Sequence, residues 1–502
     1  MVADPGRPIW RFRLLAVLAG ALLPLAFAPL DLLPLAFISP AMLFWLWCQA
    51  SRREAAIAGF LFGLGQFGVG VSWIYVAIHD VGGSPVWLAA GMTGLLVIYL
   101  SFYPALAGWL AVRWRGRLSE PWWLAGMIPA LWVLTEWLRG WILTGFTWLQ
   151  LGYSQIDLPL AGLASWLGVY GVSWAVALSS GLLVLLVRHS GTVRMAAGAG
   201  LVVVWSMAWL AGQMAWSSPV GREIRVALIQ GNTPQSTKWD PDQIRMRQDL
   251  YLRLTREHWD RDLVVWPENA LTTFYHNLEA EYLQPLAAEA RAHDTDIVFG
   301  VPVMDTATGR YYSSIAVIGA APGIYHKRHL VPFGEYVPFE SLLRGLAGFF
   351  DLPMSGFSRG SDDQPVLFAA GQPVAPSVCY EDTFSEEVID FLPRATLLIN
   401  GSNNGWYGDS FAPPQHLQMS RMRAAETARP LLRATTSGIS AIVNHRGGLV
   451  SRTPQFETAV LTGVVQPRQG ATLYVRVGNS LVIGLALLLA VGSGWRARHA
   501  RR

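Results

Sequence analysis

The distribution of apolar and polar positions divides the chain into two kinds of sequence. Residues 10–215 and 472–495 carry few charges, whereas residues 218–470 hold almost all of the acidic side chains. Seven apolar stretches in the first region approach the ~20 residues that a spanning helix needs, and an eighth follows the polar region. These stretches lie at about 11–28, 33–50, 55–78, 86–112, 121–138, 164–187, 194–215 and 474–494. The pattern predicts a multi-pass α-helical membrane domain of about eight spans.

The polar region has a different pattern. Short β-rich runs alternate there with amphipathic, helix-like segments, which is typical of an α/β domain with layered sheets and helices outside them. The predicted strands are Ile224 to Gln230, Leu263 to Trp266, Asp296 to Val303, Ser314 to Ile318, Val374 to Val378, Thr396 to Asn400 and Ile439 to Asn444. The predicted helices are Pro241 to His258, Leu278 to His293 and Pro414 to Ala428.

The positive residues predict an orientation in the membrane. Arginines precede the first span, follow the second, fourth and eighth, and bracket the loop after the sixth, whereas the intervening loops contribute essentially only Arg139. Every even crossing therefore returns to a basic side, so we expect both termini to be cytoplasmic and the polar domain to be extracytoplasmic. The predicted domains are 1–217 with seven transmembrane helices, 218–470, and 471–502 with the eighth helix and a basic cytoplasmic tail.

The N-terminus also resembles a cleavable signal peptide. Basic residues and an apolar run precede Ala26-Phe27-Ala28, which has the small residues of a cleavage site. Pro29 follows directly and argues against cleavage, so we expect the first span to be retained.

The composition supports a membrane protein. Hydrophobic residues make up 52% of the chain and charged residues 14%, against about 25% charged in a typical soluble domain. The net charge of +4 comes without any basic-aromatic recognition motif, so we expect no nucleic-acid partner.

One ionisable pair belongs to the predicted membrane part. In "EWLRGWILTGFTWLQLGYS", Glu136 and Arg139 lie at the outer end of the fifth span. Ionisable groups at membrane depth are usually functional or paired. The sequence leaves open whether this is an interfacial ion pair in a Trp and Tyr belt or part of a substrate entrance.

Three motifs in the polar domain carry candidate chemistry, and the first is "VVWPENAL". Glu268 comes just past an apolar strand. Burial among apolar residues raises the pKa of a carboxylate and makes it usable as a general base. The alternative is a solvated acid at the end of a strand.

The second motif, "YHKRHLVPFGEYVP", contains Lys327. Lysine occurs only at positions 238 and 327, although Lys and Arg together number 38. A compact ammonium suits the stabilisation of a small oxyanion better than a planar guanidinium does, although one surface lysine can also survive by chance. His326 and His329 lack a third ligand at recognisable spacing, so we expect no metal.

The third motif, "PSVCYED", places Cys379 at the end of a strand. Glu381 and Asp382 follow closely, and their negative charge disfavours the thiolate. If Lys327 and a general base converge on Cys379, the thiolate is stabilised despite these acids, which can instead anchor the site through backbone amides. Alone, Cys379 also fits a buried, inert cysteine.

Glu, Lys and Cys in this order resemble the carbon–nitrogen hydrolase (nitrilase) superfamily over residues 222–465. The resemblance implies an αββα sandwich with a Cys-Glu-Lys triad. The stretches "QGNTPQSTKWD", "WPENAL", "HKRHLVPFGEYVPFE", "SVCYED" and "NGSNNGWYGDS", the flanking spans and "RGWILTGFTWLQLGYSQ" are similar to the apolipoprotein N-acyltransferase family of Gram-negative bacteria. That similarity covers nearly the whole chain.

The resemblance assigns roles to individual residues. Glu268 would be the general base, Lys327 the oxyanion cation and Cys379 the nucleophile. The other matching positions are Glu335, a further acid of the site, Tyr380 and Glu381, which flank the nucleophile, and Trp239, an aromatic near the entrance. We expect the loop with Trp148 and Tyr153, and the apolar segment at 342–354, to edge the cavity.

The resemblance also implies the reaction. The enzyme would transfer an acyl chain from a phospholipid to the α-amino group of the diacylglyceryl-cysteine of an apolipoprotein, the last step of lipoprotein maturation. Transfer would be ping-pong through a Cys379 thioester, with no cofactor, in a monomer of the bacterial inner membrane whose catalytic domain is periplasmic. The alternatives are a membrane-tethered amidase or nitrilase acting on a small amide, and a transporter with an extracytoplasmic domain.

Overall fold

The computed structural model describes residues 9–116, 118–338 and 356–499. The chain forms two compact units. The first contains Met1–Ala215, Asp409–Gln418 and Arg476–Arg502, and the second contains Trp216–Gly408 and Met419–Val475.

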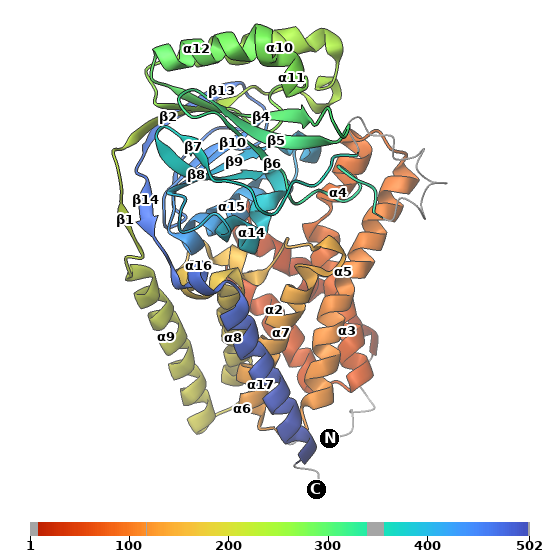
Figure 1. Cartoon of the computed structure of the whole chain (residues 1–502). Helices are drawn as coiled ribbons and strands as arrows, with labels where there is room; N and C mark the ends of the chain where they lie inside the picture. Colours follow the sequence, from red (N-terminus) through yellow and green to blue (C-terminus); the bar gives the residue numbers. More distant parts are fainter. Residues whose placement is uncertain (1–8, 117, 339–355, 500–502) are drawn as a thin grey trace. The chain divides into compact units, whose positions relative to one another are not determined.

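The first unit is helical (Figure 1). Small residues allow its helices to pack closely, since a Cβ on Gly20 of α1 would lie 1.9 Å from the carbonyl oxygen of Phe62 in α3. Its longer helices are α1 (Ile9–Leu22), α2 (Leu35–Cys48), α3 (Arg52–Gly70), α5 (Val86–Trp114), α7 (Ile128–Arg139), α8 (Ala164–Arg188), α9 (Gly191–Gln213) and α17 (Ser480–His499).

Several of these helices are apolar enough to cross a membrane. Among the described residues four helical segments qualify by length and composition, at Ile9–Ala26, Val86–Trp114, Pro159–Arg188 and Gly191–Gln213. A fifth qualifies if α3 and the helical turns at Trp73–Val81, bent by 47°, form one span. The predicted eight spans are therefore not confirmed.

The shortfall has local causes. Leu35–Cys48 and Ser480–Trp495 are apolar but shorter than 18 residues. The predicted span at 121–138 is divided, because a π turn at Trp123–Met127 precedes α7. The apolar runs in the sequence are thus longer than the regular helices within them. A prediction from hydropathy counts the whole run and so predicts more spans than the helix lengths support.

The second unit contains two six-stranded sheets. The first has the order β13-β2-β3-β4-β5-β6 and the second β12-β11-β10-β9-β8-β7. The first consists of β13 (Ala459–Val465), β2 (Ile224–Gln230), β3 (Leu263–Val265), β4 (Asp296–Met304), β5 (Tyr311–Ile318) and β6 (Gly323–His326). The second consists of β12 (Leu449–Arg452), β11 (Ala441–Val443), β10 (Leu431–Thr435), β9 (Leu397–Ser402), β8 (Gln372–Val378) and β7 (Leu367–Ala369).

The two sheets lie face to face, with β10 against β2 and β8 against β5. Helices α10 (Pro241–Arg256), α11 (Tyr275–Leu278) and α12 (Gln284–Ala292) cover the outer face of the first sheet (Figure 1). Helix α14 (Ser385–Ile389) and the second half of α15 (Ala412–Thr427) lie outside the second sheet. Each sheet therefore has one face toward the other sheet and one toward helices.

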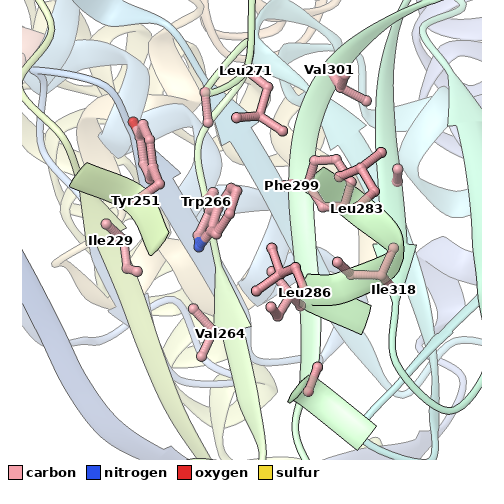
Figure 2. Packing of buried hydrophobic residues seen from close by; sticks show 14 of the residues in the cluster. Ile229, Tyr251, Val264, Trp266, Leu271, Leu283, Leu286, Phe299, Val301 and Ile318 are labelled. Carbon is pink, nitrogen blue, oxygen red and sulfur yellow. The ribbon is translucent and has the colours of Figure 1, made fainter. Parts of the chain in front are cut away.

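The core of the helix-covered layer explains why these strands form (Figure 2). Trp266, Phe299 and Ile318 from the sheet pack against Tyr251 of α10 and Leu286 of α12, all of them buried. Strands buried on both faces read as continuous apolar runs, which is the pattern of "LVVW" and "DIVFGV".

The seven predicted strands and the three predicted helical regions are confirmed. The prediction missed two short strands, β1 (Ser217–Pro219) and β14 (Arg468–Gly470), which form a separate pair, and four strands at sheet edges or with polar residues, β6, β7, β12 and β13. It also missed β10, where Arg433 interrupts an apolar run.

Candidate active site

Glu268, Lys327 and Cys379 follow strands β3, β6 and β8, and the structure brings them together. Their side chains are buried, with exposed fractions of 5%, 1% and 6% for the three residues. The Lys327 ammonium nitrogen lies 3.8 Å from Oε1 of Glu268, and both groups interact electrostatically with the Cys379 sulfur. Three positions separated by more than 50 residues thus meet in one charged, buried site.

Two glycines allow Glu268 to enter the space between the sheets. A Cβ on Gly300 of β4 would lie 2.5 Å from the Glu268 Cα, and one on Gly401 of β9 would lie 3.3 Å from the Glu268 nitrogen. Oε2 of Glu268 accepts a 2.8 Å hydrogen bond from the main-chain amide of Asn403, so one carboxylate oxygen is fixed and the other faces Lys327.

Lys327 is bound more closely to a second carboxylate. Its ammonium donates to Oε1 of Glu335 at 2.8 Å, while Oε2 of Glu335 accepts from the amide of Val331. Burial alone would lower the pKa of Lys327, but the charges of Glu335 and Glu268 outweigh it and raise that pKa. Lys327 is therefore a permanent ammonium.

Cys379 lies on a strained turn at the end of β8. Its φ is +51°, a left-handed conformation that is uncommon outside glycine and that clusters at functional sites. The side-chain amide of Asn400 on β9 donates to the Cys379 carbonyl at 3.3 Å and so supports this turn.

The Cys379 thiol is protonated at rest. Burial, followed by the charge of Glu268, raises its pKa to about 12, and the opposing effect of Lys327 is smaller. We expected Lys327 to offset the negative charge around Cys379. It does so only in part, because desolvation is the largest cause of the raised Cys379 pKa. A reaction at this sulfur needs a base that removes the proton as the bond forms, and Glu268 is adjacent.

Glu381 is an anchor between the segment that carries Lys327 and the turn that carries Cys379. Its Oε1 accepts from the Tyr325 hydroxyl at 2.9 Å and from the amides of Arg328 and His329, directly after Lys327. Its Oε2 accepts from the amide of Val378, directly before Cys379, at 2.7 Å. One buried carboxylate thus joins the lysine segment to the cysteine turn.

Asp382 is likewise held by buried hydrogen bonds. Its carboxylate binds Arg433 of β10 at 3.0 Å and accepts from the hydroxyl of Ser420. Arg433 also donates to the side chains of Asn400, Ser402 and Asn404. Arg433 was not predicted from the sequence, although an arginine inside the apolar run "LLRAT" is itself a signal of a buried polar network.

Both the apolar and the polar part of the chain match known protein families. Residues 19–182 match the apolipoprotein N-acyltransferase N-terminal domain, and residues 225–474 match the carbon-nitrogen hydrolase family. An apolipoprotein N-acyltransferase of Methylococcus capsulatus is 46% identical over 490 residues, covering 97% of this chain and 97% of that protein. The chain belongs to the apolipoprotein N-acyltransferase family.

One more relative and one solved structure are similar to this chain to different degrees. An apolipoprotein N-acyltransferase of Azotobacter vinelandii is 45% identical and covers 99% of this chain and 96% of its own. A solved CN-hydrolase superfamily protein of Xanthomonas campestris matches 49% of this chain and 91% of its own at 19% identity, with a TM-score of 0.37. The two family matches fall on the apolar helices of the first unit and on the two sheets of the second.

Tyr380 and Trp239, two further residues predicted for the site, differ in burial. Tyr380 is buried and its ring packs edge-on against Phe384 and His329. Trp239, in contrast, is half-buried on the segment before α10. Trp239 is thus partly open to solvent.

Trp148 and Tyr153 are packed inside the first unit. Their exposed fractions are 0% and 1%, and the Trp148 indole donates to Gln415 at 2.8 Å. Their expected place at an entrance stays a prediction. The segment at 342–354, expected to edge the same cavity, lies outside the described residues.

Glu136 and Arg139 support the loop that carries Trp148. Arg139 donates to the carbonyls of Phe146 and Trp148, and Oε1 of Glu136 accepts from the amide of Leu151 at 2.9 Å. Both side chains are buried. Glu136 also accepts from the Trp132 indole at 3.0 Å, and the Arg139 guanidinium lies over the Phe67 ring. These contacts with loop main chain and helix side chains give the two residues a structural role in this unit.

Lys238 is a further residue of the site to which the sequence assigned no role. Its side chain is 1% exposed, and its ammonium donates to the main-chain oxygen of Glu268 at 3.3 Å. Both lysines of the chain thus lie at this site. The scarcity of lysine, which drew attention to Lys327 in the sequence, was an equal signal for Lys238.

Proposed function

We propose that this chain transfers a fatty acyl group from a phospholipid to the α-amino group of the diacylglyceryl-cysteine of an apolipoprotein. Transfer passes through an acyl thioester on Cys379. Membership of the family supports the substrate classes, lipid and lipoprotein. The meeting of the Glu268 carboxylate and the Lys327 ammonium at a buried cysteine supports the thioester route.

In the first half of the reaction Cys379 attacks the ester carbonyl of the phospholipid. Glu268 takes the thiol proton as the carbon–sulfur bond forms, because the thiol is protonated at rest. The carbonyl oxygen becomes an oxyanion, and the ammonium of Lys327, already charged and dehydrated, stabilises it. Collapse of this intermediate breaks the ester bond, and the lysophospholipid alkoxide leaves with the proton from Glu268.

In the second half the acceptor amine attacks the thioester. The amine loses a proton to Glu268, the amide bond forms, and the carbon–sulfur bond breaks to leave a thiolate that recovers the proton. The donor ester and the acceptor amine use one site in turn, which gives ping-pong kinetics. Glu335 keeps Lys327 in place throughout, so that the same ammonium serves both oxyanions.

The reaction requires exclusion of water from the thioester. The near-complete burial of the three side chains supports this requirement. The apolar helices of the first unit fit a protein of the bacterial inner membrane. We propose in addition the eight-span arrangement with a periplasmic catalytic domain and cytoplasmic termini, which rests on the distribution of arginines.

Mass spectrometry of the intact protein tests the proposal. Wild-type protein in detergent with phospholipid should gain the mass of one acyl group, and addition of a diacylglyceryl-cysteine peptide should remove it and acylate the peptide. Cys379→Ala should gain no mass. An acyl group on Cys379→Ala would overturn the assignment of the nucleophile. Hydrolysis of a soluble amide without any lipid requirement would favour a membrane-tethered amidase instead.

A further inference from the structure

Lys238 is the second of only two lysines in the chain, and its surroundings are unusual for that residue type. Lysine is almost never fully buried unless it is paired. Lys238 is 1% exposed, yet among the described residues its ammonium has one hydrogen-bond acceptor, the Glu268 carbonyl at 3.3 Å. The other N–H groups of this buried ammonium are free to face a charge or a substrate oxygen.

The segment before Lys238 is held by several contacts. Arg247 of α10 donates to the carbonyl of Thr237 at 3.0 Å and to the hydroxyl of Thr272 at 3.0 Å. The side-chain amide of Asn403 donates to Gln235 at 2.9 Å, and the main chain of the same Asn403 binds the Glu268 carboxylate. The position of Lys238 is thus fixed relative to Glu268 from two directions.

The site has two buried carboxylates, Glu268 and Glu335, close to the Lys327 ammonium. Lys327 contacts Glu335 at 2.8 Å and lies 3.8 Å from Glu268, so one ammonium is shared between two carboxylates. A buried negative charge without a counter-charge is costly. Lys238 supplies the second positive charge next to Glu268.

We propose that Lys238 is a positioning residue of the acyl-transfer site, which fixes the Glu268 main chain and so holds the Glu268 carboxylate at the reacting sulfur. This inference rests on the proposed thioester route. Lys238 acts through Glu268, whereas Lys327 faces the reacting carbonyl.

The energetics support a functional reason for the burial. Burial, opposed by Glu268 and reinforced by the like charge of Arg247, lowers the pKa of Lys238 to about 8, and Cys379 contributes a smaller opposing effect. Keeping this ammonium charged near neutral pH therefore costs the fold free energy. A group retained at such a cost is a candidate for function.

The rate of acyl-thioester formation on Cys379, followed by quenched mass spectrometry between pH 6 and pH 10, tests the inference. Lys238→Met should form the thioester about 10²-fold more slowly at pH 7, the scale of a misplaced catalytic group, without a lower melting temperature. Lys238→Arg keeps the charge and should retain most of the rate. The wild-type rate should fall above about pH 8 as Lys238 loses its proton, and the Lys238→Arg rate should not.

Arg253→Met provides the control, because it removes an exposed charge from α10. It should leave rate and profile unchanged. A Lys238→Met rate within twofold of wild type would overturn the inference and leave the triad standing. A loss of melting temperature and rate together, without recovery in Lys238→Arg, would also overturn it, because it would show a structural role. Absence of the adduct on wild-type protein would overturn the thioester route and the inference with it.

Discussion

The main-chain amide of Asn403 donates a 2.8 Å hydrogen bond to Oε2 of Glu268. The same amide also faces the sulfur of Cys379. It belongs to the chain just after β9 of the second sheet, whereas Glu268 follows β3 of the first. One amide thus fixes the Glu268 carboxylate and the Cys379 sulfur relative to each other across the two sheets.

The substitution Glu268→Gln tests the role of this carboxylate. The glutamine side chain can still accept from Asn403, so the fold should be retained, but it cannot take the thiol proton. We expect thioester formation to slow by about 10²- to 10⁴-fold, the usual contribution of a general base. The measurement is the quenched time course of the acyl adduct, with the melting temperature as control. A rate near that of wild type would assign the base to another group.

Two glycines next to Glu268 offer a graded test of its placement. A Cβ on Gly300 would lie 2.5 Å from the Glu268 Cα, and a Cβ on Gly401 only 3.3 Å from the Glu268 nitrogen. Gly300→Ala must therefore displace main chain, whereas Gly401→Ala requires a shift of a few tenths of an ångström. We expect a large loss of acylation rate in Gly300→Ala and a small loss in Gly401→Ala. Equal effects would show that the packing at Gly300 does not position the base.

Two of the three candidate catalytic residues, Glu268 and Cys379, could be found in the sequence because each follows a short apolar strand. The strands that precede Glu268 and Cys379 were predicted within a few residues. The strand before Lys327 was missed, since "GIYH" is short and mixed in polarity. Lys327 was predicted instead from the scarcity of lysine in the chain.

Other features of the site depend on contacts between distant segments. Lys238 stands in the polar stretch "QSTKWD", which resembles a surface loop. Its ammonium bonds to the Glu268 main chain, and Arg247 bonds to the carbonyl of Thr237, the residue before it. Arg433 is similar, since its partners come from several segments.

The number of spans also depends on where helices break, which hydropathy does not record.

The buried pair of Lys327 and Glu335 should be sensitive to removal of one partner. Glu335→Leu leaves the ammonium with Glu268 at 3.8 Å as its remaining carboxylate, and breaking such pairs costs about 3–5 kcal/mol. We expect a marked drop in melting temperature. The double variant Lys327→Met/Glu335→Leu should regain much of that loss and still form no thioester.

Exposed ion pairs provide the matched comparison. Arg256 and Glu289 lie 2.5 Å apart with side chains 50% and 36% exposed, and such pairs contribute about 0–1 kcal/mol. Glu289→Leu should therefore change the melting temperature little. A double variant at Lys327 and Glu335 that is as unstable as the sum of the single variants would show that the two groups are not coupled.

The stability cost of Lys238 should depend on pH. Its pKa falls from an ordinary 10.5 to about 8 in the folded chain. Between these values the unfolded chain binds a proton that the folded chain does not, so this group makes folding more favourable as the pH rises through the window. Below about pH 8 the folded protein carries the full cost, a few kcal/mol at about 1.4 kcal/mol per pKa unit.

Lys238→Met removes this titration, so the difference between the two proteins isolates it. At pH 7 the variant should melt at a temperature equal to or above that of wild type, and the difference should shift in favour of wild type as the pH approaches 10. Thermal unfolding of both proteins in the same detergent, at intervals from pH 7 to pH 10, measures this. A difference that stays constant across the range would mean that Lys238 keeps an ordinary pKa, and hence that its ammonium is hydrated in the folded chain.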